Sequence, residues 1–490
     1  MTLSDLLFGV TIKSIIGDIS QVDVNKIEFD SRNINESDLF IAIKGLTVDG
    51  HDYISKSIEL GAKSIVVEEF PKEIIEGICY VKVESSSYSM SVIASNYFDN
   101  PSSKIKLVGV TGTNGKTTIA TLLHKLFSDL GYVSGLLSTI ENKIGTLSFK
   151  STHTTGDSLQ INKSLSEMID AGCEYCFMEV SSHAIHQNRV SNLRFEGGIF
   201  TNITHEHLDY HKDFKQYIST KKKFFDELDF SSFAITNKDD KNGRIMLSNT
   251  DARKITYSLK SMADYKCKLL ESRIDGMLLN IQNIEVWVNI IGEFNAYNLL
   301  AIYAASVELG LEPSKVLERI SVLSPAEGRF HRVRNSENVT GIIDYMHTPD
   351  AYKNVLSTIN NIRKNNEKLI MVFGCGGDRD AEKRPQMTDI ACNHSDKVII
   401  TADNPRTEDL ESIINDMISD LDPVQKKKVL VITDRSQAIK TACSLANCGD
   451  IVLLAGKGHE KYQDINGQKY PFDDVKELME SLNINTENVI

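Results

Sequence analysis

A Gly-rich turn near residue 112 joins an apolar run to a helical pattern and carries the residue types that bind phosphate. The stretch is Leu107-Val-Gly-Val-Thr-Gly-Thr-Asn-Gly-Lys-Thr-Thr118. Free backbone N–H groups of such a turn, and of the first helical turn after it, point at anionic oxygens. Lys116 adds a positive charge for the β- and γ-phosphates, and Thr117 offers a hydroxyl to Mg²⁺. In the strict P-loop pattern, G-x-x-x-x-G-K-[ST], the first residue is glycine, and here that position is Val110. The stretch therefore predicts a variant nucleotide-binding loop.

A carboxylate and a histidine-rich segment follow this loop. Glu179 ends an apolar run, and the histidines lie in Thr201-Asn-Ile-Thr-His-Glu-His-Leu-Asp-Tyr-His211. A carboxylate and a neutral imidazole near the phosphates would complete a Mg²⁺ site with Thr117. Two alternatives stay open from the residues alone: a solvated or capping glutamate, and a transition-metal site made by the histidines.

The elements that position these residues predict an α/β fold in three domains. A chain of 490 residues is long enough for about three cores of ordinary size. Strand and amphipathic-helix patterns alternate from about 105 to 325, as in a parallel sheet, and short apolar runs repeat at 369–373, 398–401, 429–432 and 451–454. We expect a small N-terminal α/β domain at 1–100, a central P-loop-type parallel-sheet domain at 101–327 and a Rossmann-like α/β domain at 328–490.

Composition excludes several classes of protein. A net charge of −13 argues against a general nucleic-acid binder. We expect neither a signal peptide, because Asp5 interrupts the first apolar run, nor a membrane span, because no apolar run is long enough. Eight scattered cysteines favour reduced thiols and a cytoplasmic location. The single pair Cys173 and Cys176 fits buried thiols better than a metal or redox site.

Several motifs at ordered spacing resemble the Mur ligases, over nearly the whole chain. These are ATP-dependent enzymes that form the amide bonds of the peptide stem in bacterial cell-wall precursors. Besides the phosphate loop, the matching motifs are Met178-Glu-Val-Ser-Ser-His183, His207-Leu-Asp-Tyr-His211, Gly292-Glu-Phe-Asn-Ala-Tyr-Asn298, Gly328-Arg329 and Asp344-Tyr-Met-His-Thr-Pro349. Glu206 replaces a usual Asp and Met346 a usual small residue, and we expect little effect from either.

The resemblance implies an ATP and Mg²⁺ site in the central domain. Lys116, Glu179, His207 and Lys221 are the implied catalytic residues, and Thr117, Glu179, His207 and Lys221 the implied metal ligands. Lys221 matches the lysine that is carbamylated in this family, where the carbamate serves as an anionic oxygen ligand. The implied ATP contacts are Gly112, Thr113, Asn114, Gly115, Lys116, Thr117, Thr118, Asn295, Asn298, Arg329, Asp344 and His347.

The resemblance also implies two further substrates. The N-terminal domain and part of the central one would bind UDP-N-acetylmuramoyl-L-Ala-D-Glu, through Ser31, Thr154, Thr155, Ser181, Gln187 and Arg189. The C-terminal domain would bind the incoming amino acid, through Arg379, Asp403, Asn404, Pro405, Arg406, Gly456 and Glu460. Members with arginine at the place of Arg406 generally take meso-diaminopimelate, whose second carboxylate a planar guanidinium can grip with two hydrogen bonds. L-lysine or another diamino acid stays an alternative, and we expect a monomer.

A rival interpretation comes from Thr236-Asn-Lys-Asp-Asp240, which would pass for the guanine-reading motif of a switch GTPase. Such a GTPase also needs an Asp-x-x-Gly tetrad that senses the γ-phosphate, and none occurs between Thr118 and Asn237. A nucleotide-binding regulator without catalysis is a further alternative. Lys116, Glu179, His207 and Lys221 argue against it, because a pure binder would not need all four.

Overall fold

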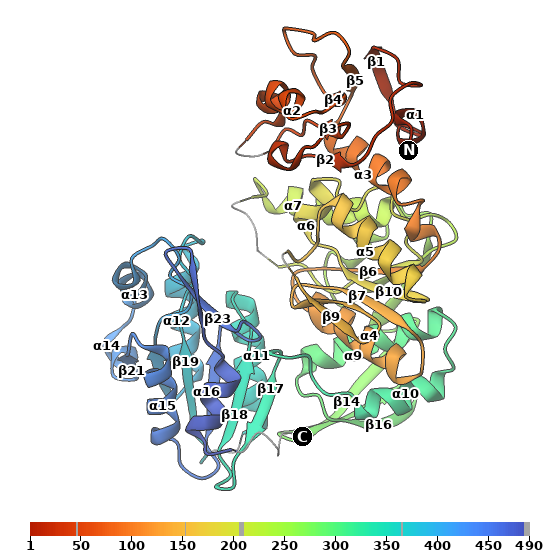
Figure 1. Cartoon of the computed structure of the whole chain (residues 1–490). Helices are drawn as coiled ribbons and strands as arrows, with labels where there is room; N and C mark the ends of the chain where they lie inside the picture. The colour runs from red at the N-terminus through yellow and green to blue at the C-terminus, as the bar shows by residue number, and fades with distance from the viewer. Residues whose placement is uncertain (46–47, 152, 205–209, 364–365, 485–490) are drawn as a thin grey trace.

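A computed structural model describes residues 1–45, 48–151, 153–204, 210–363 and 366–484. Successive parts of the chain each build their own sheet, and Figure 1 shows the N-terminal part above the central part, with the C-terminal part beside the central one. His207 lies outside the described residues, as do Glu206 and Asp209. The boundaries predicted near residues 100 and 327 stay predictions.

The N-terminal sheet has the strand order β1-β5-β4-β3-β2 in the described residues. The strands predicted near 39–43 and 64–67 are present, and the expected linker after Asn100 forms a short 3-10 helix. The elements of this part are α1 (Leu3–Leu6), β1 (Ile12–Ile16), β2 (Ile27–Glu28), η1 (Ser31–Asn33), β3 (Leu39–Ile41), η2 (Gly50–Tyr53), α2 (Ile54–Glu59), β4 (Ser64–Val67), β5 (Cys79–Val83), α3 (Ser86–Tyr97) and η3 (Pro101–Ser103).

The central sheet is parallel in its middle and antiparallel at its edges. Its described order is β16-β15-β14-β13-β12-β11-β6-β10-β7-β8-β9, in which the strands from β14 to β7 pair in parallel. The hairpins at either edge add antiparallel pairs to the parallel sheet that the sequence predicts. Its strands are β6 (Lys106–Thr111), β7 (Ser134–Leu137), β8 (Glu141–Ile144), β9 (Leu147–Lys150), β10 (Tyr175–Glu179), β11 (Gly197–Phe200), β12 (Phe233–Asn237), β13 (Arg253–Ser258), β14 (Tyr265–Arg273), β15 (Gly276–Ile281) and β16 (Ile284–Val288).

Helices cover this sheet with apolar faces. Ile119, Leu123 and Phe127 of α4 are fully buried, at the helical spacing that the sequence shows. The central helices are α4 (Lys116–Asp129), α5 (Ser158–Asp170), α6 (Ser182–His186), α7 (Phe214–Asp226), α8 (Gly243–Met246), α9 (Glu293–Glu308) and α10 (Pro313–Val322).

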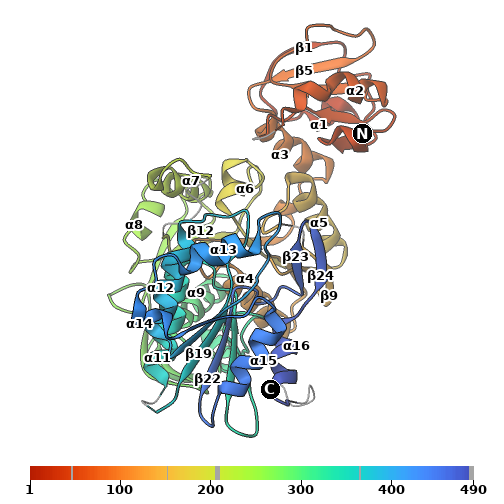
Figure 2. The same ribbon diagram turned by 90° about the vertical axis from the view of Figure 1, so that its left-hand side faces the viewer.

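The C-terminal sheet has the described order β17-β18-β22-β19-β20-β21 and is parallel apart from its edge strand β17. All four apolar runs predicted here are strands. Figure 2 shows this domain in front of the central one. Its elements are β17 (His331–Arg334), β18 (Thr340–Asp344), α11 (Pro349–Ile362), β19 (Leu369–Phe373), α12 (Lys383–His394), β20 (Lys397–Ile400), α13 (Leu410–Ile418), α14 (Pro423–Lys426), β21 (Val429–Val431), α15 (Arg435–Leu445), β22 (Ile451–Ala455), β23 (Tyr462–Ile465), β24 (Gln468–Pro471) and α16 (Asp474–Ser481).

Strand order explains where a site can form. The phosphate loop follows β6, and Glu179 ends the neighbouring strand β10. In the C-terminal sheet, the segments after β19, β20 and β22 leave adjacent strands at the same edge. Ligands of open parallel sheets bind beyond such carboxyl ends. The fold therefore offers two binding edges, one in each domain.

Candidate active site

The phosphate loop needs glycine at two positions. Gly112 has φ +150° and Gly115 has φ +92°, backbone angles that residues with a Cβ rarely adopt. A Cβ at Gly112 would lie 1.9 Å from Oγ1 of Thr201, and one at Gly115 would lie 2.6 Å from Oδ1 of Asn298. Lys116 begins α4 and its Nζ donates to the carbonyl oxygens of Gly112 (2.9 Å) and Thr113 (2.7 Å). The loop therefore keeps a lysine and a helix N-terminus together, as phosphate binding requires.

Thr117 and Glu179 form a pair of hard oxygen donors beside this loop. Oγ1 of Thr117 donates to Oε2 of Glu179 (2.9 Å), and the backbone N–H of Thr139 donates to Oε1 (2.7 Å). The Glu179 side chain is fully buried. Arg329, from the C-terminal domain, donates to Thr117 Oγ1 (3.2 Å). A hydroxyl and a carboxylate in contact fit a Mg²⁺ ion, which prefers oxygen ligands.

Lys221 lies against the same loop from helix α7. Its side chain is 1% exposed, and its Nζ donates to the carbonyl oxygen of Gly112 (2.9 Å), which also accepts from Lys116. The Nζ also lies 4.8 Å from the centre of the Tyr217 ring. A carbamate would keep one N–H for the Gly112 carbonyl, so this hydrogen bond is compatible with the modification. In the described part of the chain, no group of three or more His, Cys, Asp or Glu side chains makes a metal site by itself.

Two of the predicted ATP contacts, Asn295 and Asn298, lie on α9 beside the loop. Nδ2 of Asn298 donates to Oδ1 of Asn295 (3.0 Å), whose own Nδ2 donates to Ile291 O (2.8 Å). Both asparagines are buried. Asn298 packs against Gly115, as the close approach to a Cβ there shows. These residues therefore support the loop.

The segment that begins the C-terminal domain reaches across to the central domain. The guanidinium of Arg329 lies 4.6 Å from the centre of the Tyr345 ring, and Nδ1 of His347 donates to Tyr345 O (3.0 Å). Asp344 accepts from the backbone N–H groups of Phe330 (2.7 Å) and Met346 (2.8 Å), and burial raises the pKa of its carboxyl. Asp344 therefore fastens the crossing segment to β18.

A second contact between the domains involves the phosphate loop directly. Nδ2 of Asn114 donates to Oδ2 of Asp350 in the first turn of α11 (3.3 Å). Burial raises the pKa of the Asp350 carboxyl. The C-terminal domain thus touches the loop at Asn114 as well as at Thr117.

Four of the residues predicted to hold the muramoyl dipeptide, Thr155, Ser181, Gln187 and Arg189, form one hydrogen-bonded group. Oγ1 of Thr155 donates to Glu179 O (2.8 Å) and accepts from the backbone N–H of Ser181 (3.1 Å). Arg189 donates to Thr155 O (3.0 Å) and to Oε1 of Gln187 (2.8 Å). This group joins the end of β10 to α6. Ser31 lies apart from it, buried in η1 of the N-terminal domain.

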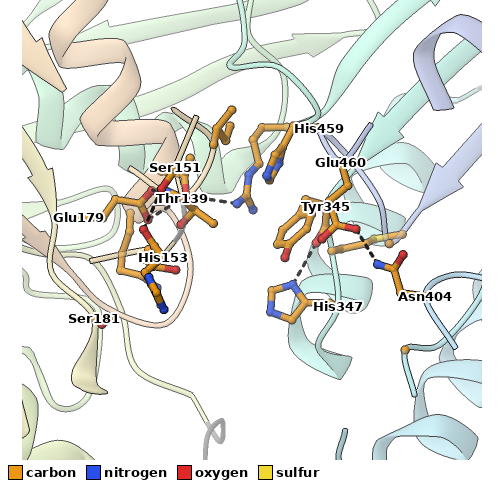
Figure 3. A pocket seen from close by; sticks show the side chains of 18 of the residues that line it. Thr139, Ser151, His153, Glu179, Ser181, Tyr345, His347, Asn404, His459 and Glu460 are labelled. Atoms are coloured by element: carbon orange, nitrogen blue, oxygen red, sulfur yellow. Dashed lines mark hydrogen bonds between the residues drawn. The ribbon is translucent and has the colours of Figure 1, made fainter. Parts of the chain in front are cut away.

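The predicted amino-acid residues meet at the edge of the C-terminal sheet. Nδ2 of Asn404 donates to Oε2 of Glu460 (2.8 Å), and burial, followed by the charge of Asp403, raises the pKa of the Glu460 carboxyl. The pairing is visible on one side of the cavity in Figure 3, with Glu179 on the other. Oδ2 of Asp403 lies close to Gly456, where a Cβ would come within 2.6 Å of it.

Two arginines complete this edge. A Cβ at Gly376 would lie 3.0 Å from a terminal nitrogen of Arg406 and 3.7 Å from Cγ of Arg379, so the glycine leaves room for both. Arg406 has φ +52°, an uncommon angle for a non-glycine residue. The hairpin of β23 and β24 holds it there, because Arg406 N–H donates to Asp464 O (3.0 Å) and Asn466 N–H donates to Arg406 O (2.7 Å).

One cavity of about 1580 Å³ joins the two edges across the domain boundary. It brings together most of the predicted site residues, namely Thr113, Asn114, Gly115, Lys116, Thr117, Thr154, Thr155, Glu179, Ser181, Arg189, Lys221, Arg329, His347, Arg379, Asp403, Asn404, Arg406, Gly456 and Glu460. Among the described residues, those that lie outside its lining are Ser31, Gly112, Thr118, Gln187, Asn295, Asn298, Asp344 and Pro405. The individual roles of all these residues stay predictions.

Several lining residues were missed by sequence reasoning. His459 lies 4.8 Å from Tyr345, centre to centre, and burial, followed by the charge of Arg329, lowers its pKa to about 3. Its place between Gly456 and Glu460, two of the predicted amino-acid contacts, was the available signal. Thr139 and the hairpin of β8 and β9 have no such signal, because only the pairing of β7 with β10, a strand distant in sequence, brings them to the cavity.

The residues of the GTPase-like motif have structural partners. Asp239 accepts from the hydroxyls of Ser258 (2.7 Å) and Tyr297 (2.9 Å), and Asp240 accepts from the backbone N–H of Ile203 (2.9 Å). These bonds join the segment after β12 to the end of β13, to α9 and to the segment after β11. The arrangement favours a structural role for the two carboxylates over guanine recognition.

The fold and the site are those of an enzyme in which one domain binds a nucleotide and another domain holds a second substrate at the same cavity. Family models for the Mur ligase family, catalytic domain, the Mur ligase middle domain and the Mur ligase, glutamate ligase domain match residues 23–106, 110–306 and 328–458. The chain belongs to the Mur ligase family, which confirms the resemblance seen in the sequence.

Individual relatives match along the full length. The UDP-N-acetylmuramoyl-L-alanyl-D-glutamate–2,6-diaminopimelate ligase of Cytophaga hutchinsonii is 51% identical over 98% of this chain and 100% of its own. The protein of the same name from Phocaeicola vulgatus is 49% identical over 98% and 99%. A solved structure of a ligase with this name superposes with a TM-score of 0.70 at 30% identity, over 99% of each chain. The predicted three-domain α/β fold is thereby confirmed.

Proposed function

We propose that this protein is an ATP-dependent ligase that joins meso-diaminopimelate to the D-Glu γ-carboxylate of UDP-N-acetylmuramoyl-L-Ala-D-Glu, a step in peptidoglycan precursor synthesis. The observation that carries the proposal is the cavity that joins the phosphate loop to Arg379, Arg406 and the carboxylates of Asp403 and Glu460. The shared name of the relatives at 51% and 49% identity supports the substrate assignment.

The first chemical step is phosphoryl transfer. An oxygen of the γ-carboxylate attacks the γ-phosphorus of ATP, and ADP leaves with the electron pair of the broken P–O bond. Lys116 offsets the charge that develops on the transferred group, the effect expected to dominate this chemistry. The product is an acyl phosphate on the dipeptide.

Thr117, Glu179 and Lys221 would hold Mg²⁺, together with His207. When bound, the ion neutralises phosphate charge and orients the oxygens of ATP. Glu179 is fixed for this task by the Thr139 N–H. Lys221, as a carbamate, would replace a cation against the loop with an anionic oxygen ligand.

The second step forms the amide bond. The free amine of diaminopimelate attacks the acyl carbon, phosphate leaves, and the nitrogen loses a proton. Arg406 and Arg379 bind the distal carboxylate, while Asp403, Asn404 and Glu460 bind the distal amine. Because the two substrates sit on different domains, the contacts of Arg329 with Thr117 and of Asp350 with Asn114 help to close the site against water.

We further propose that the enzyme acts as a cytoplasmic monomer. In the residues that the structure describes, no helix is long and apolar enough to cross a membrane. Sedimentation of the purified protein would test the oligomeric state, and a dimer that persists on dilution would contradict it.

ADP release tests the function. Purified protein is given ATP, Mg²⁺ and UDP-N-acetylmuramoyl-L-Ala-D-Glu with meso-diaminopimelate, with L-lysine or with no amino acid. Turnover with diaminopimelate alone is the expected result. Preference for lysine would keep the ligase and overturn the role of Arg406. No turnover with any amino acid would contradict the ligase and favour a nucleotide-binding regulator or a GTPase.

A further inference from the structure

A fully buried lysine lies behind the amino-acid edge of the cavity. Lys457 follows β22, its side chain is 0% exposed, and it is not among the described residues that line the cavity. An ammonium taken out of water is costly unless other groups compensate it. Its position therefore calls for an explanation beyond packing.

The partners of Lys457 are the residues that face the cavity. Its Nζ donates to Oδ1 of Asn404 (3.0 Å) and lies 3.4 Å from Oε2 of Glu460. Oδ1 of Asp403 lies 3.5 Å from the same nitrogen. One ammonium thus holds three polar side chains from two loops, and all three line the cavity.

The charges of this cluster suit one end of a diamino acid. Asp403 and Glu460 contribute two negative charges and Lys457 one positive charge, so the cluster carries one net negative charge. Arg379 and Arg406 stand on the same side of the cavity. A substrate end with one ammonium and one carboxylate matches the cluster and the arginines together.

We propose that Lys457 is a positioning residue that sets the geometry and net charge of the Asp403, Asn404 and Glu460 cluster, and through it the affinity for the amino-acid substrate. This inference rests on the proposed function. Lys457 acts from behind the cavity wall, through the residues that touch the substrate.

The two strand ends beside Lys457 are held together by a second buried cation, Arg435. Arg435 is also fully buried, and it donates to Ala402 O (3.3 Å) and Ala455 O (3.1 Å) at the ends of β20 and β22. Its bond to Asp474 (2.7 Å) neutralises it. Because Arg435 keeps the two strand ends together, loss of the Lys457 charge should loosen the cluster without separating the loops.

Titration gives a signature that simple packing would not. The groups that face Glu460 are Asp403, Lys457, Asn404 and Tyr345. Lys457 opposes the burial and the Asp403 charge that raise the pKa of Glu460. Removal of the ammonium should therefore raise this pKa further, and protonation of Glu460 would weaken amine binding at a higher pH than before.

The test compares Lys457→Met and Lys457→Arg with wild type, by ADP release at varied pH. For Lys457→Met we expect KM for meso-diaminopimelate to rise about tenfold or more. This is the size of effect expected when the substrate loses about one charge-assisted hydrogen bond to the cluster. KM for ATP and for the UDP-dipeptide should change less than about twofold. The acid limb of kcat/KM for the amino acid should move to higher pH, and Lys457→Arg should partly restore both.

Lys428→Met is the matched control. Its Nζ donates to the carbonyl oxygens of Cys392 and Ser395, in the same domain but away from the cavity. It should leave all three KM values and the pH profile unchanged. An unchanged KM for diaminopimelate in Lys457→Met, or equal changes for all three substrates, would overturn the inference alone. A wild-type protein without turnover would overturn the proposed function as well.

Discussion

The phosphate loop and the amino-acid edge of this protein bind charged groups in different ways. The loop is a contiguous stretch, 112–118, whose phosphate-binding shape depends mainly on glycine backbone angles and on a helix N-terminus. The amino-acid edge is assembled from residues 376–379, 403–406 and 456–460 after three strands, and it depends on buried charged side chains. A local site is therefore sensitive to backbone changes, whereas an assembled site can be altered one side chain at a time.

The largest effect should come from Lys116→Ala. Removal of the one loop side chain that offsets phosphate charge should lower kcat for ADP release about 1000-fold or more. The binding of diaminopimelate, measured by calorimetry on the enzyme with bound UDP-dipeptide, should be unchanged. Near-normal turnover would remove the loop from the mechanism.

Gly112→Ala tests whether ATP binding by the loop depends on the backbone angles of its glycines. The new Cβ meets Thr201 Oγ1 at 1.9 Å with φ at +150°, so the loop must move. We expect KM for ATP to rise about 100-fold, from strain of roughly 3 kcal/mol. Gly131→Ala is the matched control, because Gly131 has φ +91° but no atom within 4 Å of its Cβ position. It should cost about 1 kcal/mol of unfolding free energy and leave KM for ATP unchanged.

Arg406→Ala probes the assembled edge by a single side chain. Loss of its hydrogen bonds to the distal carboxylate should raise KM for diaminopimelate about 10- to 100-fold and leave KM for ATP unchanged. Discrimination against L-lysine should fall by a similar factor. Arg406→Lys keeps the charge without the paired hydrogen bonds and should recover only part of the loss. Unchanged discrimination in Arg406→Ala would show that another residue selects the substrate.

The smallest effect concerns stability in acid. Burial lowers the pKa of His124, in the helix α4 that follows the loop, to about 4, and that of His459, in the amino-acid edge, to about 3. Between pH 6.5 and these values the unfolded chain binds protons that the folded protein does not, so stability falls as the pH falls.

Thermal unfolding of His124→Asn and His459→Asn between pH 7 and 4 measures which of the two regions causes the loss of stability in acid. Each variant should flatten the decline of Tm, by about 2–4 °C over this range. A decline identical to that of wild type in both would assign the acid sensitivity to other groups.

Much of the fold followed from local patterns. The strands at 369–373 and 451–454, and the helix after Lys116, depend on apolar periodicity and a Gly-rich turn, which are properties of contiguous residues. The antiparallel edges were missed because hairpins at the end of a parallel sheet are decided by which strand is free to pair.

The candidate site divides in the same way. Lys116, Glu179 and Arg406 were found from motifs. Lys457 was not singled out, because its importance lies in partners at 403 and 404 that are distant in sequence.

The sequence by itself determined the phosphate loop, the family and the segments that end at the two binding edges, because glycine angles, helix periodicity and motif spacing act over short stretches of chain. Only the tertiary structure decided that Thr117 meets Glu179, that Arg329 crosses between domains and that one cavity joins both edges. These contacts depend on strand order and on burial, which bring charged groups from distant segments together where each must find a partner.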